Sequence, residues 1–137
     1  MNLKINKIQH IGIPVTNMKN SITFYEGLGF SNVMIAQFEM NSEKGDVTMM
    51  QLDEIVIELY QMPNSELPAI KARKNGHIDH IAFDVDDIES CFLMMQKEGY
   101  AIQEPAPVFL QFWTKGCKYF NILGPDGERI EFNEILK

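Results

Sequence analysis

Four residues in this sequence have side chains suited to binding a divalent metal: His10, Glu58, His80 and Glu131. Each stands in a short run where apolar residues alternate with other residues, as in IQHIGIPV and ERIEFNE. In a strand, successive side chains point to opposite faces, so each of the four points away from its apolar neighbours. Two imidazoles and two carboxylates on the non-core faces of strands are the donor set of a metal centre, if the fold brings them together.

The second half of the chain repeats the pattern of the first half, and this repeat is the reason to expect that the four side chains meet. When the second half is laid on the first, His80 falls on His10, and with a short insertion Glu131 falls on Glu58. Helices and glycines between these positions align as well. We therefore predict a duplicated module with one His and one Glu in each copy.

Each module is predicted to have the element order β-α-β-β-β. In the first, Thr16 or Asn17 caps the helix, Gly27 and Gly29 end it, and Gly45 is expected to take a positive φ in a turn. The expected strands are 7–15, 31–40, 46–52 and 55–62.

In the second module, Asp86 or Asp87 caps the helix, and Pro105 and Pro107 suggest an edge strand or loop. The remaining expected strands are 76–85, 117–123 and 128–136. The predicted fold class is α+β: two tandem β-α-β-β-β modules that form a curved mixed sheet with a cleft. The 137 residues make one domain, in which a first module (7–62) and a second module (76–135) are joined by a linker (63–75).

Composition excludes several classes of partner. The formal charge is -7 and the pI about 4.9, so binding to nucleic acid through phosphate contacts is not expected. No apolar stretch reaches the roughly 18 residues of a membrane span and no signal peptide is recognisable, so we expect a cytoplasmic protein without membrane contact. Cys91 and Cys117 have no metal-binding or redox spacing and are expected to be reduced thiols.

Four segments carry a resemblance to a known family: HIGIPV, FYEGLGF, DHIAFDVDDIE and GPDGERIEFNE. Together they resemble the vicinal oxygen chelate superfamily, with glyoxalase I (lactoylglutathione lyase) and methylmalonyl-CoA epimerase as the nearest members. The resemblance implies that His10, Glu58, His80 and Glu131 are the metal ligands. It also implies one divalent ion per site, with Ni²⁺ or Co²⁺ favoured and Zn²⁺ or Mn²⁺ possible, and a homodimer.

The implied activity is a metal-dependent lyase or isomerase of the glyoxalase type. Such an enzyme transfers a proton through a metal-stabilised enediolate on a thiol adduct of an α-ketoaldehyde. A metal ion acts as a Lewis acid on the carbonyl oxygen, and a carboxylate nearby can act as the base. Glu131 is the first choice for the base, with Glu58 as its partner.

Three alternatives stay open. The first is an epimerase of the methylmalonyl-CoA type acting on a thioester, although such epimerases tend to have a glutamine where Glu58 stands. The second is a metal-free small-molecule binding protein of the bleomycin-resistance type, against which four intact ligands argue. An extradiol dioxygenase is the least favoured, because that chemistry prefers a face of two histidines and one carboxylate.

The residues around the ligands bear on the substrate. Short bacterial glyoxalases typically carry an arginine where Pro14 stands and often an asparagine where Met62 stands, and both meet the glutathione carboxylate. This sequence therefore favours another small thiol adduct or thioester as substrate. The expected substrate-binding residues are Met62 and an aromatic cluster of Phe109, Phe112 and Trp113.

Overall fold

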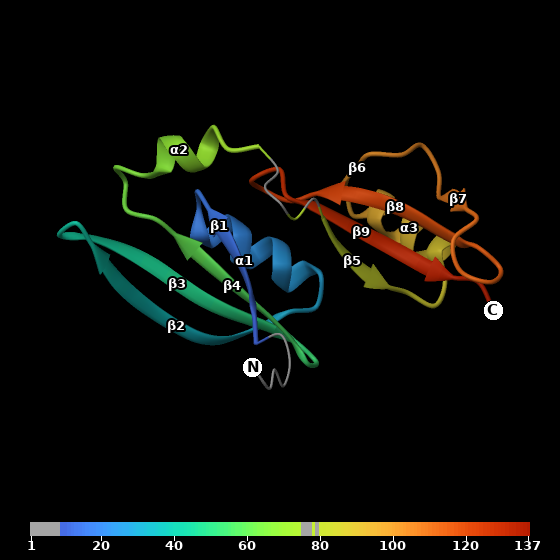
Figure 1. Cartoon of the computed structure of the whole chain (residues 1–137), viewed down its shortest axis with the longest axis horizontal. Helices are drawn as coiled ribbons and strands as arrows, with labels where there is room; N and C mark the ends of the chain where they lie inside the picture. The colour runs from blue at the N-terminus through green and yellow to red at the C-terminus, as the bar shows by residue number, and fades with distance from the viewer. Residues whose placement is uncertain (1–8, 75–77, 79) are drawn as a thin grey trace, which may run out of the picture. The chain divides into compact units, whose positions relative to one another are not determined.

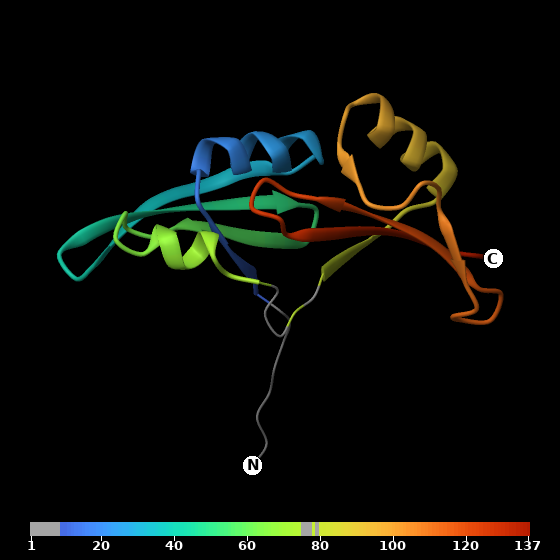
Figure 2. The same ribbon diagram turned by 90° about the horizontal axis from the view of Figure 1, so that it is seen from above.

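The computed structural model describes residues 9–74, 78 and 80–137 and divides into two compact units, Met1–Arg73 and Lys74–Lys137. Each unit consists of a mixed sheet with a helix on one face, as Figures 1 and 2 show for each unit separately. This arrangement of two mixed sheets and few helices confirms the predicted α+β fold class.

The first unit has a four-stranded sheet in the order β1-β4-β3-β2, with β1 parallel to β4 and the other pairs antiparallel. The short helix α2 follows the sheet, within the segment predicted as the linker. The elements are β1 (Ile11–Val15), α1 (Met18–Gly27), β2 (Ser31–Met40), β3 (Glu43–Leu52), β4 (Ile55–Gln61) and α2 (Leu67–Lys71).

The second unit repeats this plan. Its sheet has the order β5-β9-β8-β6, with β7 also paired to β8, and β5 is parallel to β9. The proline-containing segment forms only the short strands β6 and β7. The elements are β5 (His80–Asp84), α3 (Ile88–Lys97), β6 (Ala101–Ile102), β7 (Val108–Leu110), β8 (Cys117–Leu123) and β9 (Arg129–Ile135).

Helices α1 and α3 each pack on the apolar face of their own sheet. Alternation along the strands places the large apolar side chains on that face, and burying them supplies most of the free energy of folding. The buried core of the first unit includes Ile13, Val15, Tyr25, Phe30, Met50, Ile57 and Leu59. That of the second unit includes Ile88, Cys91, Phe92, Met95, Cys117, Phe120, Ile122, Ile130 and Phe132.

Both cysteines are buried and unpaired, as the sequence suggests. Burial raises the pKa of the Cys91 thiol, and the negative charge of Asp87 raises it further. Because the thiolate is the reactive form, a raised pKa makes Cys91 a poor nucleophile.

The first turns of α1 and α3 are capped in the same way in the two units. Asn17 and Asp87 cap α1 and α3 by accepting hydrogen bonds from the backbone N–H of Asn20 and Ser90, each 3.0 Å long. These two caps are among the residues that the sequence proposes.

The last strand of each unit also holds the start of the helix. The backbone N–H of Met18 donates to Oε1 of Gln61 at 2.7 Å, and that of Ile88 donates to Oε2 of Glu134 at 2.9 Å. Gln61 follows Glu58 at the same interval at which Glu134 follows Glu131, so the two acceptors occupy equivalent positions. The repeat thus includes a contact that fixes the helix against the strand that carries the candidate metal-binding carboxylate.

One turn differs from the prediction. The β2–β3 connection turns at Asn41 and Ser42, which have φ values of 53° and 63°, and Gly45 lies within β3. Gly45 is needed for a different reason: a Cβ there would clash with the ring of Phe38 and lie 2.8 Å from the carbonyl oxygen of Gln61. Residues 7 and 8 of the predicted first strand lie outside the described residues, as do three of the residues expected to begin the strand 76–85.

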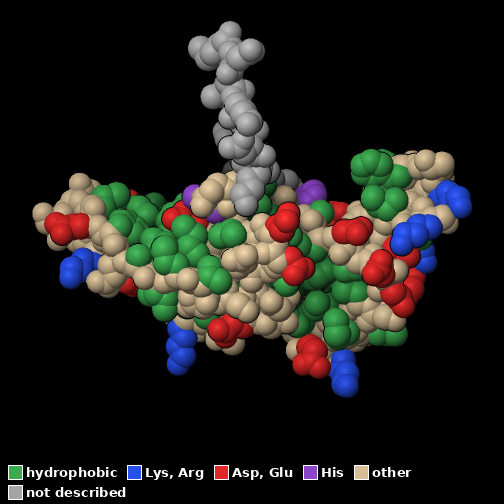
Figure 3. Space-filling view, turned by 90° about the horizontal axis from the view of Figure 1, so that it is seen from below, with side chains coloured by type: hydrophobic (Ala, Val, Ile, Leu, Met, Phe, Trp, Pro, Cys, Tyr) green, Lys and Arg blue, Asp and Glu red, His purple; other side chains and the backbone are tan. Residues whose placement is uncertain are grey.

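The outer strand β2 exposes several apolar side chains. Val33, Met34 and Ile35 are 54%, 42% and 71% exposed, and Figure 3 shows hydrophobic side chains gathered over this sheet. In the part of the chain that the structure describes, no helix is long and apolar enough to cross a membrane.

The contact between Glu134 and α3 predicts a stability effect. Replacing Glu134 by alanine leaves the N–H of Ile88 without its acceptor, so we expect the free energy of unfolding to fall by about 1 kcal/mol in urea titrations. Glu134→Gln is the matched control. Its free energy of unfolding should stay close to that of the original protein, since Gln61 makes the same contact in the first unit. Equal losses in both variants would show that the hydrogen bond is not the cause.

Candidate metal centre

The first unit brings His10 and Glu58 together. Nε2 of His10 lies 3.4 Å from Oε2 of Glu58, and the two side chains are 35% and 26% exposed. Nδ1 of His10 contacts Oε1 of Gln9. Nε2 is therefore the ring nitrogen that faces Glu58 and is placed to bind a metal ion.

The second unit brings His80 and Glu131 together with the same geometry. Nε2 of His80 lies 3.4 Å from Oε2 of Glu131, and these side chains are 39% and 14% exposed. The second carboxylate is therefore less exposed than the first.

Strand register explains why the two pairs match. Glu58 lies opposite Gly12 in the parallel β1–β4 pair, and Glu131 lies opposite Ala82 in the parallel β5–β9 pair. Each histidine precedes that opposite residue by two positions. Side chains two positions apart share a face of the strand, so each imidazole lies diagonally across from its carboxylate.

The donor atoms of each pair suit a shared cation. A separation of 3.4 Å is longer than an ordinary hydrogen bond. It is close to the roughly 3 to 3.5 Å between two atoms that each bind one divalent ion at about 2.1 Å. A neutral imidazole lone pair facing a carboxylate oxygen is unfavourable unless a proton or a metal lies between them, so the chemistry of the donor set fits a metal.

Each unit alone supplies two of the four predicted ligands. Within residues 9–74, 78 and 80–137, no cluster of three or more His, Cys, Asp or Glu side chains is positioned to hold a metal ion. The prediction that both pairs bind one ion therefore remains a prediction.

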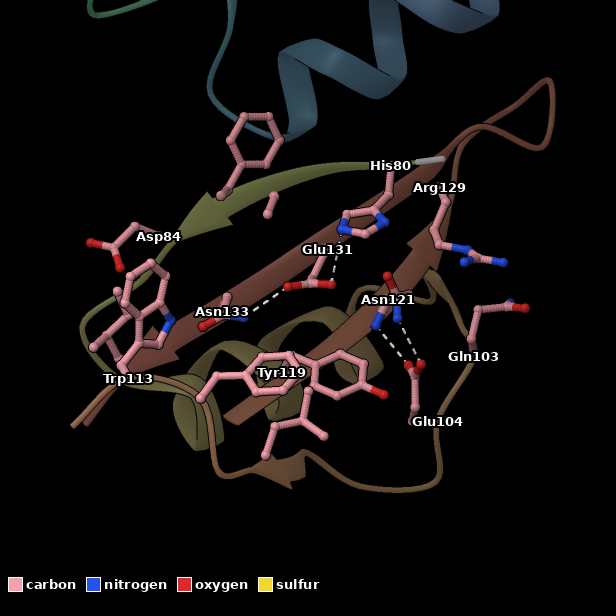
Figure 4. Close-up of a pocket in the computed structure, with 15 residues that line it drawn as sticks. His80, Asp84, Gln103, Glu104, Trp113, Tyr119, Asn121, Arg129, Glu131 and Asn133 are labelled. Atoms are coloured by element: carbon pink, nitrogen blue, oxygen red, sulfur yellow. Dashed lines mark hydrogen bonds and ion pairs between the residues drawn. The ribbon is translucent and has the colours of Figure 1, made fainter. Parts of the chain in front are cut away.

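A pocket of about 740 Å³ lies on the polar face of the second sheet, shown in Figure 4. Both His80 and Glu131 line it, so the candidate ligands of this unit face a space that can hold a small molecule. The other lining residues are Ala82, Phe83, Asp84, Gln103, Glu104, Leu110, Phe112, Trp113, Tyr119, Asn121, Arg129, Asn133 and Ile135.

Asparagine side chains fix the carboxylates of this pocket. Nδ2 of Asn133 donates to Oε1 of Glu131 at 2.8 Å, which directs Oε2 towards His80. Glu104 accepts two hydrogen bonds from Asn121, from the backbone N at 2.6 Å and from Nδ2 at 2.7 Å. The carbonyl oxygens of both asparagine side chains are buried, and neither has a hydrogen-bond partner among the residues that the structure describes.

The predicted substrate-binding residues are distributed differently. Phe112 and Trp113 line the pocket, and Trp113 has a φ of 63°, which is unusual for a bulky side chain. Phe109 is not among the residues that line this pocket, and its ring covers Gly116, where no Cβ would fit. Met62 is half-buried in the first unit, directly after β4.

Several residues of the pocket were not identified from the sequence: Glu104, Tyr119, Asn121, Arg129 and Asn133. The alternation of polar and apolar residues could have identified the pocket residues on β8 and β9. They alternate with the buried residues Phe120, Ile122, Ile130 and Phe132. For Glu104, which lies between two strands, no periodic pattern exists.

Comparison with known proteins identifies the family. The sequence profile of the Glyoxalase/Bleomycin resistance protein/Dioxygenase superfamily matches residues 7–132. The uncharacterized protein YwbC of Bacillus subtilis is 36% identical in an alignment 135 residues long, and the alignment covers 92% of this chain and 95% of that protein.

Solved structures agree on the fold. A glyoxalase family protein from Bacillus cereus has a TM-score of 0.72 at 20% identity, covering 98% of this chain and 97% of that one. The trypanothione-dependent glyoxalase I of Leishmania major has a TM-score of 0.68 at 21% identity, covering 93% and 86%. Since the family profile spans nearly the whole chain, this protein belongs to the Glyoxalase/Bleomycin resistance protein/Dioxygenase superfamily, the vicinal oxygen chelate superfamily that its sequence resembles.

Proposed function

We propose that this chain is a metal-dependent lyase or isomerase of the glyoxalase type. It would transfer a proton next to a carbonyl, through an enediolate, on a thiol adduct of an α-ketoaldehyde. The observation that carries the proposal is the repeated geometry of the two His/Glu pairs, each with Nε2 and Oε2 3.4 Å apart. Membership of the superfamily supports the general class of chemistry.

The four proposed metal ligands are His10, Glu58, His80 and Glu131. Two nitrogen and two oxygen donors suit Ni²⁺ or Co²⁺, with Zn²⁺ or Mn²⁺ as further possibilities. A bound ion would supply Lewis acidity that stabilises negative charge on the substrate oxygen. The protein's own contribution is to hold the imidazoles and carboxylates in place before the metal and substrate arrive.

Contacts of the two glutamates favour different roles. Glu131 is held by Asn133 as well as by its histidine. Within the described residues, His10 is the one hydrogen-bond or ion-pair partner of the Glu58 carboxylate, which is also more exposed. Glu131 was the first choice for the base on sequence grounds, whereas these contacts favour Glu58 as the carboxylate that moves to take the proton, with Glu131 as the fixed member of the catalytic pair.

The proposed substrate is a thiol adduct other than that of glutathione. Pro14 is buried in β1 and Met62 is half-buried after β4, so neither offers a partner for a carboxylate in the first unit. Recognition would instead come from the polar pocket of the second unit, with Phe112 and Trp113 as an apolar wall.

We also propose a homodimer. An outer strand with unpaired backbone groups favours association with another strand, and exposed apolar side chains on it strengthen this tendency. Strand β2 has both features, with Val33 and Ile35 more than half exposed.

Metal titration tests the site without relying on catalysis. Chelator-treated protein should bind one Ni²⁺ or Co²⁺ per chain, and single replacement of any of the four ligands by alanine should weaken binding by at least about a hundredfold. Glu26→Gln is the control, because Glu26 is exposed on α1, which packs on the opposite face of the sheet. Light scattering on the same samples gives the number of chains. If the metal content is far below one ion per chain and addition of Ni²⁺, Co²⁺, Zn²⁺ or Mn²⁺ does not restore it, a metal-dependent function is excluded.

A substrate panel tests the reaction. Metal-loaded protein is assayed with methylglyoxal and several thiols, and separately with acyl-CoA epimers followed by exchange of the α-proton with solvent. We expect turnover with at least one thiol adduct and a poor rate with glutathione. No turnover with any thiol adduct would exclude the glyoxalase reaction, and α-proton exchange on the thioester alone would establish the epimerase.

Replacing each glutamate separately tests the division of roles. Glu58→Gln should lower kcat by about 10² to 10⁴-fold, the range for loss of a general base. Glu131→Gln should mainly weaken metal binding, so part of its lost activity should return at high metal concentration. Full turnover in Glu58→Gln, together with loss of turnover in metal-saturated Glu131→Gln, would reverse the two assignments.

A further inference from the structure

The two units carry the same ligand pair but different neighbours around it. Along β9, Arg129 and Asn133 flank Glu131 on the same face. At the equivalent positions of β4, Val56 and Tyr60 flank Glu58. The repeated frame therefore does not by itself require an arginine beside the ligand.

The neighbouring strand shows the same difference. Asn121 lies opposite Glu131 on β8, whereas Met49 lies opposite Glu58 on β3. In the second unit the ligand pair is thus bordered by a cation and two amides. In the first unit it is bordered by Val56, Met49 and Tyr60, which are mainly apolar.

Arg129 is well placed to meet a bound molecule. It lies opposite His80 in the parallel β5–β9 pair and lines the 740 Å³ pocket. Figure 4 shows its side chain beside His80, on the side of the pocket that Gln103 and Asn121 also line. Among the described residues that line this pocket, it is the one Lys or Arg.

Asn121 is oriented for recognition by its contacts with Glu104. Both Nδ2 and the backbone N of Asn121 donate to that carboxylate, so the orientation of the side-chain amide is fixed. The Glu104–Asn121 contact thus gives this wall of the pocket a fixed polar group. Fixed polar groups of this kind provide specificity because they need no reordering when a ligand binds.

From these placements we propose that Arg129 is an anion-binding subsite, which selects substrates with a carboxylate or phosphate group. The inference rests on the proposed function and narrows its substrate class. A guanidinium binds either group with two parallel hydrogen bonds. Arg129 and Glu131 are two positions apart on a strand, about 7 Å. An anionic group a few bonds from the reacting carbon would therefore lie within reach of the Arg129 side chain.

Three small probes test this subsite: 4-oxopentanoate, its neutral amide, and hydroxyacetone phosphate. Each probe carries a ketone, and in the two anions the carboxylate or phosphate lies a few bonds from that ketone. Binding is measured by titration calorimetry on the full chain, both metal-free and loaded with Zn²⁺, so that no turnover is needed. We expect at least one anion to bind more tightly than the amide, and the tighter of the two identifies the group as carboxylate or phosphate.

Variants assign the binding to Arg129. Arg129→Gln should weaken binding of the preferred anion by about 10- to 100-fold and leave binding of the amide unchanged. The affinity of Arg129→Lys for the anion should lie between those of the original protein and of Arg129→Gln, because lysine lacks the paired donors of a guanidinium. Lys118→Gln is the control, since Lys118 lies in the same sheet and is not among the residues that line this pocket.

The proposal is overturned if the anions bind equally well to the original protein and to Arg129→Gln, or if neither anion binds either form. Metal titration of Arg129→Gln separates the two proposals. If the original protein binds no metal but binds an anion through Arg129, the proposed function fails and this subsite stands. If metal binding is intact but the anions bind Arg129→Gln as tightly as the original protein, this subsite fails and the proposed function stands.

Discussion

Parallel pairing of the first and last strands is the constraint on which each candidate ligand pair depends. In each unit this pairing sets the glutamate opposite a small residue, Gly12 or Ala82, and puts the histidine two positions earlier on the same face. A shift of one residue in either register would turn the histidine or the glutamate towards the helix. The hydrogen bonds that Gln61 and Glu134 accept from the helix starts tie the same last strands to the helices, which helps to hold that register.

Duplication made the ligand pairs alike and left their surroundings free to differ. Around Glu131, Asn133 restrains the carboxylate and Arg129 adds positive charge, whereas around Glu58 the flanking side chains are Val56 and Tyr60. Two otherwise equal carboxylates can thereby take different roles. In other acid–base sites, too, differences in surroundings give two like groups different functions. Under the proposed function, one unit would supply the polar recognition of the substrate, and the other would supply the less restrained base.

Much of the fold could be predicted from the sequence because it depends on local alternation and on helix caps. Asn17 and Asp87 are proposed as caps from residue type and position alone, and both make the expected hydrogen bond. Gly45 was assigned the wrong role, because its clash with Phe38 and Gln61 arises only once β2, β3 and β4 lie side by side. Contacts across strands cannot be read from a one-dimensional pattern.

The candidate site could be predicted only in part, for the same reason. The His/Glu pairs follow from the repeat, and the structure brings each pair together. The contact of Asn133 with Glu131 is also local, since the residues are two positions apart on one strand. By contrast, the contact of Glu104 with Asn121 joins residues 17 positions apart through an irregular segment, so neither composition nor periodicity indicates it.

The central claim is that the two pairs form one metal centre, and X-ray absorption spectroscopy of Ni²⁺-loaded protein tests it most directly. The spectrum reports the number and type of atoms bound to the ion. We predict two imidazole nitrogens, with oxygen atoms from the two carboxylates and from water completing six-fold coordination. A single imidazole per ion would contradict a centre built from both pairs, and sulfur in the coordination sphere would contradict the ligand assignment altogether.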